Sequence, residues 1–392
     1  MTMKKLKLIH MVILFWLLIL IAKWELLYNI MNFVLYVFRG NVKIQKIDIA
    51  LLDYVVATLL FFILPFVAWK FRKKLNVRIS GASFSVTMFF FFVLFAPLIA
   101  TSNPAMHHDI KKCKLLAPFS SVAIEERTNI KISNASSGLH EFYNKIINRG
   151  IDKNTLYLKA NNQNNSKKLF FLFGTDEYGR DVFSRILYGT RFAFFLGISS
   201  VIISFSLAFL LGAAAGFGGK FWDNLLNRFT EIFLSFPFLF LIIVFLAFFG
   251  NSFWVVVFVL GFSGWMGLFK IIRAEILRLK SKDFIISAKM LGMPEYKILL
   301  KEIFPVILAP VTVNLVLQFG NVIMAESALS FLGFGVGDEY FSWGAMINSG
   351  QYYLANAWWL SFFPSLFLAL TLITMNKTGN ELEKIYNPGS TK

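Results

Sequence analysis

Long apolar runs alternate with short basic or polar segments along most of the chain. A run of about 20 apolar residues is long enough to cross a bilayer as a helix. Residues 26–38 are also apolar, and they either extend the first of these helices or lie along the membrane interface. The predicted fold class is all-α, a polytopic transmembrane bundle with about eight spans near residues 6–22, 49–69, 83–100, 190–216, 229–249, 253–272, 306–332 and 357–375.

Basic residues in the short loops predict the side of the membrane on which each loop lies. The short loop after the second run is the most basic, and such loops stay in the cytoplasm; it contains Lys70, Arg72, Lys73, Lys74 and Arg78. Counting spans from this loop places both termini and the loop 273–305 in the cytoplasm. The basic residues in and beside the loop 273–305 favour the same cytoplasmic placement: Lys270, Arg273, Arg278, Lys280, Lys282, Lys289, Lys297 and Lys301.

The first apolar run has a basic start, which fits either a cleaved signal peptide or a membrane anchor. No small-residue cleavage site follows this run, because Lys23, Trp24 and Glu25 come next. We therefore expect an uncleaved anchor.

A polar segment separates the third run from the fourth. Residues 101–170 are rich in Asn, Lys and Ser and have little apolar periodicity, so they predict an extracytoplasmic insertion. Long loops escape the charge rule, so the lysines of this segment do not contradict that placement. The predicted organisation is an N-terminal hairpin with its basic loop, a first core span, the insertion, and the remaining core, at residues 1–80, 81–100, 101–173 and 174–388.

Composition supports an integral membrane protein that is embedded in the lipid bilayer. The chain is 57% hydrophobic and 16% charged, whereas soluble domains carry about 25% charged residues. The net charge of +17 does not indicate nucleic-acid binding, because much of the excess lies in loops beside apolar runs. A single cysteine, Cys113, excludes a disulfide within the chain.

The loop 273–305 has the pattern of two short helices joined by a turn. Gly292 fits the left-handed position that ends a helix, and Pro294 fits the first position of the next helix. Small residues at Ser287 and Ala288 leave a shallow face that either enters a partner's groove or packs back on the chain's own bundle. The first helix is predicted from Ser281 to Leu291, with four apolar residues near one face: Phe284, Ile285, Ala288 and Leu291.

Two further groups of polar residues have both a functional and a structural interpretation. The segment before the fourth run carries Asp176, Glu177, Arg180, Asp181 and Arg185. It could form a hydrolytic or ion site, but turns at its glycines and an i,i+4 pair between Asp181 and Arg185 favour a structural interface.

The other group lies inside the run 306–332. Asn314, Gln318 and Asn321 share one face of the predicted helix, and Glu326 follows further along. These four residues predict either a water-lined translocation path or hydrogen bonds between helices.

The cytoplasmic loop resembles the EAA loop of ABC-importer permeases, whose pattern is E-A-A-x3-G-x9-I-x-L-P. Ile286-Ser287-Ala288 occupy the first three positions, Gly292 the glycine, and Glu302-Ile303-Phe304-Pro305 the end. Ile286 replaces the usual Glu, so the contact that this carboxylate makes to the motor is not expected here, although Asp283 keeps an acid nearby. The resemblance implies these ATPase-coupling residues: Lys282, Asp283, Phe284, Ser287, Ala288, Leu291, Gly292 and Pro305.

Residues 84–388 are similar to the C-type subunit of the dipeptide/oligopeptide/nickel permease family. Ordered blocks carry this similarity: FAPLIATSNP (95–104), GTDEYGRDVFSR (174–185), AESALSFLGFGV (325–336), SWGAMI (342–347), AWWLSFFPSL (357–366) and TGNELEKIYNP (378–388), with Asn380 where Asp is usual. The resemblance implies a six-span core plus an N-terminal hairpin of about two extra spans. It also implies an outer-side signature at Gly174, Thr175, Asp176, Gly179, Arg180 and Asp181.

The resemblance implies a permease subunit of an ATP-driven importer in the bacterial inner membrane, forming half of the path for peptides or similar small polar solutes. Its implied partners are a second homologous permease, two ATPase subunits and an extracytoplasmic solute-binding protein. The chain lacks a Walker A motif, since Gly219-Lys220 is followed by Phe221. We therefore expect ATP to be used by the partner subunits, and no catalytic residue, cofactor or metal in this chain.

Two other function classes are compatible with parts of the sequence. An ion-gradient-driven secondary transporter or channel needs several buried acids, and Glu326 is the best candidate. A membrane-bound enzyme would use Asp176, Glu177 and Asp181, but no nucleophile, base and metal set accompanies them.

Overall fold

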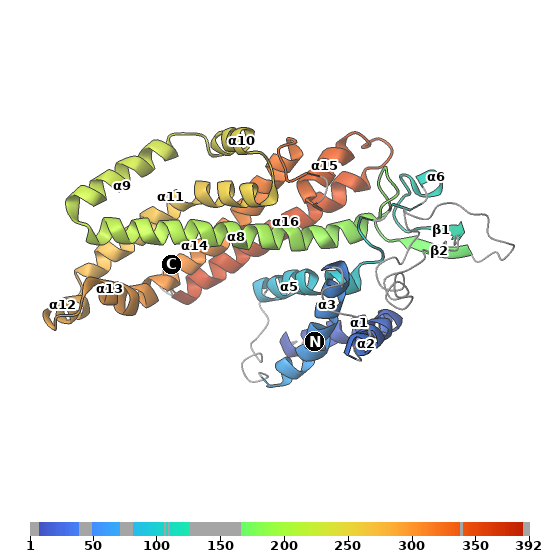
Figure 1. The fold of residues 1–392 in the computed structure, drawn as a ribbon, viewed down its shortest axis with the longest axis horizontal. Helices are drawn as coiled ribbons and strands as arrows, with labels where there is room; N and C mark the ends of the chain where they lie inside the picture. The colour runs from blue at the N-terminus through green and yellow to red at the C-terminus, as the bar shows by residue number, and fades with distance from the viewer. Residues whose placement is uncertain are drawn as a thin grey trace, which may run out of the picture. The chain divides into compact units, whose positions relative to one another are not determined.

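The computed structural model describes residues 8–38, 49–70, 81–105, 107–108, 110–125, 166–337 and 340–386. Helices predominate in these ranges, which confirms the predicted class of a transmembrane helical bundle (Figure 1). Two bent helix pairs bring the number of spans to six if each pair counts as one. Four other segments are each long and apolar enough to cross a membrane: α8 (Val182–Phe217), α11 (Phe253–Lys280), Glu295–Phe331, which contains α14 (Phe304–Phe331), and α16 (Trp359–Tyr386).

The chain divides into two units, one of residues 1–191 and 349–365 and one of residues 192–348 and 366–392. The first unit begins with α1 (Leu8–Ala22) and α2 (Trp24–Phe38), which are bent by 86° where they meet. The apolar residues 26–38 therefore form a separate helix and do not extend the first one. The bent pair is followed by α3 (Ile49–Lys70) and α5 (Gly81–Ile99).

One apolar cluster joins these four helices. Helix α2 is amphipathic and buries Leu26, Leu27, Ile30 and Phe33 on one face. The same cluster contains residues of α1, α3 and α5, among them Ile19, Phe61 and Phe95. The N-terminal helices are thus packed on the first helix of the predicted permease core.

The described part of the polar insertion contains α6 (Ile110–Cys113) and a two-stranded antiparallel sheet of β1 (Ser120–Glu125) and β2 (Ser166–Phe171). The sheet begins with Ser120 opposite Phe171. The sequence pattern did not predict these strands, because they are short and far apart in the chain, with no tight turn to signal a hairpin. Cys113 and Phe171 form a small core with Leu116, Val122 and Leu169.

In the second unit the predicted span 229–249 is wrong as a single helix. It is divided between α9 (Gly219–Leu234) and α10 (Phe238–Phe249), which are bent by 87° relative to each other. Pro237 occupies the N-cap of α10. Proline lacks a backbone N–H and disfavours helical conformation in the residue before it, which explains why the helix is interrupted here.

The remaining elements of the second unit belong to the loop 273–305 and to the segment between α14 and α16. Figure 1 shows α12 and α13 at one end of the helices of this unit. The elements are α12 (Asp283–Met290), α13 (Glu295–Lys297), the π-helical turn η2 (Ile298–Ile303) and, in part, α15 (Trp343–Gln351).

Candidate coupling and translocation sites

The predicted helix–turn–helix of the loop 273–305 is present, and Gly292 ends its first helix. Gly292 has a φ of +77°, a conformation that glycine adopts without steric cost. The Met293 N–H donates to the Ala288 carbonyl and the Gly292 N–H to the Lys289 carbonyl, both at 3.1 Å. These two bonds make a Schellman motif. Pro294 is the N-cap of α13 and not its first helical residue, one position from the prediction.

This segment, here called the helical tip (residues 282–297), has two apolar surfaces. Ile285 is buried with Ile298 and Ile303 in the core of the second unit, and Ala288 packs against the same cluster. On the other side Met290 and Leu291 are 83% and 86% exposed. The four apolar residues predicted to share one face are therefore divided between a packed face and an uncovered one.

Most of the predicted coupling residues are exposed. Lys289 Nζ is 3.6 Å from Glu295 Oε1, so an exposed ion pair spans the Gly292 turn. Ile286, at the position of the missing Glu, is 41% exposed. Of the eight predicted coupling residues only Ala288 is half-buried, and seven are exposed: Lys282, Asp283, Phe284, Ser287, Leu291, Gly292 and Pro305.

Two basic residues attach the end of α11, which leads into the helical tip, to neighbouring helices. Lys280 Nζ donates to the Gly216 carbonyl at 2.7 Å, at the carboxyl end of α8 where the helix dipole favours a cation. Arg273 makes a bidentate pair with Asp223 of α9. These contacts join segments far apart in the sequence, and the local pattern gave no signal for them.

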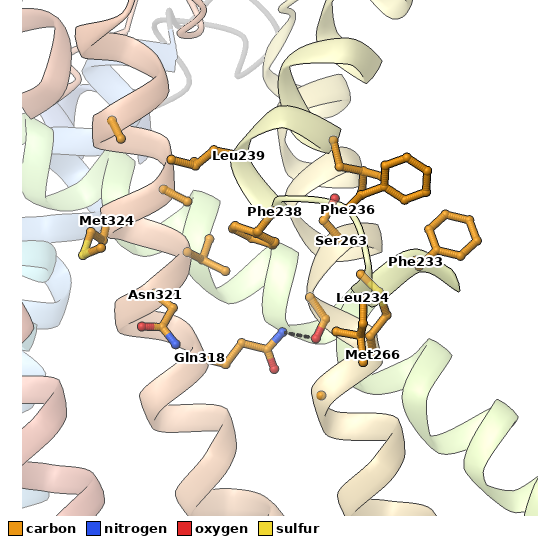
Figure 2. Close-up of a pocket in the computed structure, with 16 residues that line it drawn as sticks. Phe233, Leu234, Phe236, Phe238, Leu239, Ser263, Met266, Gln318, Asn321 and Met324 are labelled. Atoms are coloured by element: carbon orange, nitrogen blue, oxygen red, sulfur yellow. Dashed lines mark hydrogen bonds between the residues drawn. The ribbon is translucent and has the colours of Figure 1, made fainter. Parts of the chain in front are cut away.

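A cavity of about 500 Å³ lies where α9 and α10 meet α11 and α14 (Figure 2). None of the described residues that line it is charged. Its walls are mostly apolar and include Phe233, Phe238, Leu239, Met266 and Met324. Polar groups in the lining come from Ser263, Gln318 and Asn321. Such a cavity suits a solute that is recognised by hydrogen bonds and apolar contact.

Gln318 both lines the cavity and joins three helices. Its Nε2 donates to Ser204 Oγ of α8 at 2.6 Å and to the Gly264 carbonyl of α11 at 3.2 Å. In Figure 2 the side chain of Gln318 reaches from α14 toward α11, with Asn321 beside it on the same helix. The predicted hydrogen bonds between helices are therefore present at Gln318, and the solute path stays a prediction.

Asn314 and Glu326 are not among the residues that line this cavity. The Asn314 amide donates to the Pro310 carbonyl of its own helix at 2.9 Å. Glu326 is 3% exposed, and its Oε1 accepts hydrogen bonds from Ser330 at 2.6 Å and from Ser342 at 2.7 Å. The expectation that Glu326 continues the polar face of Gln318 is corrected: the structure places it on another face of α14, against the residue that precedes α15.

The outer-side signature forms a buried network around Asp176. Its Oδ1 accepts the backbone N–H of Tyr178 at 2.9 Å and of Arg180 at 2.8 Å. Its Oδ2 accepts from Arg180 Nε at 2.6 Å and from Arg185 Nη1. The predicted pair between Asp181 and Arg185 is wrong, because Arg185 pairs with Asp176 and Asp181 instead accepts hydrogen bonds from Thr101 and Ser184.

Glycine and burial determine the shape of this outer network. Gly174 has a φ of +76°, and a Cβ there would lie 2.3 Å from the Leu116 carbonyl oxygen. The Trp359 indole donates to the Thr175 carbonyl at 3.3 Å. Burial raises the pKa of the Asp181 carboxyl, and burial lowers the pKa of His108 to about 4. Because Asp176 is fully occupied by two arginines and two backbone N–H groups, the arrangement fits a structural role better than a hydrolytic one.

Comparison with known proteins identifies the family. The family described as "Binding-protein-dependent transport system inner membrane component" matches residues 208–391, which contain α9 to α16, the helical tip and the cavity. The dipeptide transport system permease protein DppC of Bacillus subtilis is 34% identical over 217 residues, which are 55% of this chain and 68% of DppC. The chain belongs to this family.

Two further relatives are also named as peptide permeases. The oligopeptide transport system permease protein OppC of Haemophilus influenzae is 37% identical over 219 residues, 56% of this chain and 70% of that protein. OppC of Escherichia coli is 34% identical over 216 residues, 55% of this chain and 72% of that protein. This permease is thus a multi-pass inner-membrane subunit of an ABC importer.

Proposed function

We propose that this permease imports peptides, as half of a translocation path completed by a second, homologous permease subunit. The relatives it matches are named as dipeptide and oligopeptide permeases. The observation that carries the proposal is the uncharged cavity with the amides of Gln318 and Asn321 in its wall. Carboxamides can donate to and accept from a peptide backbone whatever the side chains are, and apolar walls accommodate varied side chains.

The proposed energy source is ATP hydrolysis by two separate ATPase subunits that bind the helical tip on the cytoplasmic side. The exposed Met290 and Leu291 would be buried in a groove of the ATPase, and Ile286 would add apolar contact in place of an ion pair. Closure of the ATPases would displace α12, which begins at Asp283. The hydrogen bond from Lys280 to α8 would transmit this displacement to the bundle, whose packed helices would then rock as a unit.

The remaining partners and the orientation follow from the same proposal. An extracytoplasmic binding protein would deliver the peptide to the side of the Asp176 network, and both termini of the chain would lie in the cytoplasm. In this arrangement the chain itself has no catalytic residues and binds neither cofactor nor metal.

The test is peptide uptake by vesicles that contain the full complex. The labelled tripeptide is added outside the vesicles, and ATP is enclosed inside them. Leu291→Asp should abolish uptake and peptide-stimulated ATP hydrolysis, because it places a charge in the proposed apolar contact, while membrane abundance stays unchanged. Leu291→Met is the matched control and should retain uptake. Uptake that follows an ion gradient without the ATPases, or normal uptake by Leu291→Asp, would refute the proposal.

A further inference from the structure

Asp53 of α3 and Arg191 of α8 form an ion pair between two apolar helices that are far apart in the sequence. Arg191 Nη2 donates to Asp53 Oδ1 at 2.6 Å, and Nη1 donates to Oδ2, so the pair is bidentate. The two side chains are 21% and 26% exposed. A charge in such helices is costly without a partner, and a bidentate pair admits one relative orientation.

Two tyrosines extend this pair into a polar cluster: Tyr54 is adjacent to Asp53 in α3, and Tyr188 is one turn before Arg191 in α8. The Arg191 guanidinium lies 5.8 Å from the centre of the Tyr188 ring. The Tyr188 side chain is hydrogen-bonded to Tyr54, and Tyr54 is 3% exposed. Two adjacent residues of α3 therefore meet two residues on one side of α8.

The helices before α5 are themselves packed as one body. Trp16 of α1 donates its indole N–H to the Phe61 carbonyl of α3 at 2.9 Å, and the two rings stack at 5.4 Å. Phe61 in turn meets Phe95 of α5 edge to face at 5.9 Å. Movement of α3 would therefore move α1 and disturb the packing on α5.

A second polar contact lies at the bend between α1 and α2. Lys23 Nζ donates to the Ala100 carbonyl at 3.2 Å. Ala100 directly follows α5, so a cation meets the carboxyl end of that helix, where the dipole favours it. The N-terminal helices thus contact α5 at its end as well as along its side.

We propose that α1, α2 and α3 are a brace that positions α5 and the start of α8 in the working permease, and that the Asp53–Arg191 pair holds the brace in register. Apolar packing alone tolerates sliding between helices, whereas a bidentate ion pair does not. Asp53 and Arg191 are positioning residues in this arrangement, and the brace is a part of the transporter and not only a membrane anchor.

The test uses the full chain with a protease site inserted between α3 and α5 and a tag at the C-terminus. After cleavage in the membrane and mild solubilisation, the N-terminal piece should co-purify with the tagged remainder. Asp53→Leu and Arg191→Met should each release at least about fivefold more of it, because each leaves one part-buried charge unpaired in an apolar helix. The double variant leaves no charge and should release less than either single variant.

Arg228→Gln is the matched control, because Arg228 pairs with Glu231 on an exposed surface, and it should not change release. In the uncut chain, assembled with its partners, each single variant should lose transport at unchanged abundance, and the double variant should recover part of it. Equal release by all variants, or a double variant that releases as much as the worse single one, would overturn the brace. Failure of the wild-type chain to transport peptides would affect the proposed solute and leave the co-purification result intact.

Discussion

The side-chain amide of Gln318 reaches the Gly264 carbonyl at 3.2 Å, across a gap that only a glycine leaves open. A Cβ at position 264 would lie 2.4 Å from Gln318 Nε2 and 3.2 Å from Ser204 Oγ. The absence of a side chain at Gly264 therefore permits the contact among α8, α11 and α14 that borders the cavity.

Gly264→Ala should destabilise the subunit by about 1–3 kcal/mol through overpacking and should lower transport by displacing Gln318. Thermal unfolding of the purified subunit in detergent measures the first effect. Gly267→Ala is the control on the same helix, because nothing lies within 4 Å of a Cβ there. Equal destabilisation by both substitutions would show that the contact with Gln318 is not the cause.

Gly292→Ala should impair coupling while the subunit still inserts into the membrane. The left-handed conformation costs a residue with a Cβ about 1–2 kcal/mol, and a shift of the turn would move Leu291. Gly219 is a close match, with a φ of +80° against +77° at Gly292 and open space around both. Peptide-stimulated ATP hydrolysis should fall in Gly292→Ala and stay near wild type in Gly219→Ala; an equal fall in both would indicate general strain.

Glu326→Leu should destabilise the second unit by about 1–3 kcal/mol, because it leaves the hydroxyls of Ser330 and Ser342 without their acceptor. Glu326→Gln keeps an oxygen acceptor of similar size and should cost less. The two variants are compared by thermal unfolding in detergent. Equal losses for Gln and Leu would mean that the carboxylate charge, which both variants remove, and not hydrogen-bond acceptance, is what matters at this position.

Stability should fall as the pH falls from about 6.5 toward 4, in part because of His108. Neither of its ring nitrogens has a hydrogen-bond partner among the described residues. Burial, with a smaller contribution from His107 and against the attraction of Asp176, lowers its pKa from 6.5 to about 4. The unfolded chain then binds a proton that the folded chain does not, a loss of about 3 kcal/mol over this range.

The measurement for His108 is the difference between the wild type and His108→Leu in unfolding at pH 7 and pH 4.5. The raised pKa of Asp181 acts in the opposite direction, because a buried carboxyl that takes up a proton stabilises the fold as the pH falls. The substitution isolates the histidine from that effect. His107→Gln should retain the pH dependence, and a His108→Leu variant with the wild-type slope would contradict the assignment.

Local patterns in the sequence were enough to predict the turn of the helical tip. Gly292 and the apolar residues before it indicated a helix end, and the structure has the expected left-handed φ and backbone hydrogen bonds. The interruption at Pro237 had the same kind of local signal but lay inside an apolar run, where hydropathy alone suggested one span.

Side-chain partners were predicted less well, because they depend on which helix faces which. Asp181 and Arg185 are at ideal helical spacing, yet Asp181 precedes α8 and turns to Thr101 and Ser184. Arg185 instead reaches Asp176, which a turn at Gly179 brings within range. Spacing along the chain describes only contacts within one helix, and these contacts cross between segments.

The sequence by itself determined that the chain is a bundle of membrane helices, where most of these helices lie, and which family the chain resembles. It could do so because hydrophobic length and short motifs are local properties. Only the tertiary structure decided that Asp53 meets Arg191, that Gln318 reaches Gly264, and that Glu326 is enclosed by serines. The contacts of Asp53 and Gln318 join segments distant in the chain, and Glu326 meets both a serine of its own helix and Ser342 beyond that helix. The energy of these contacts depends on the burial and orientation that packing alone establishes.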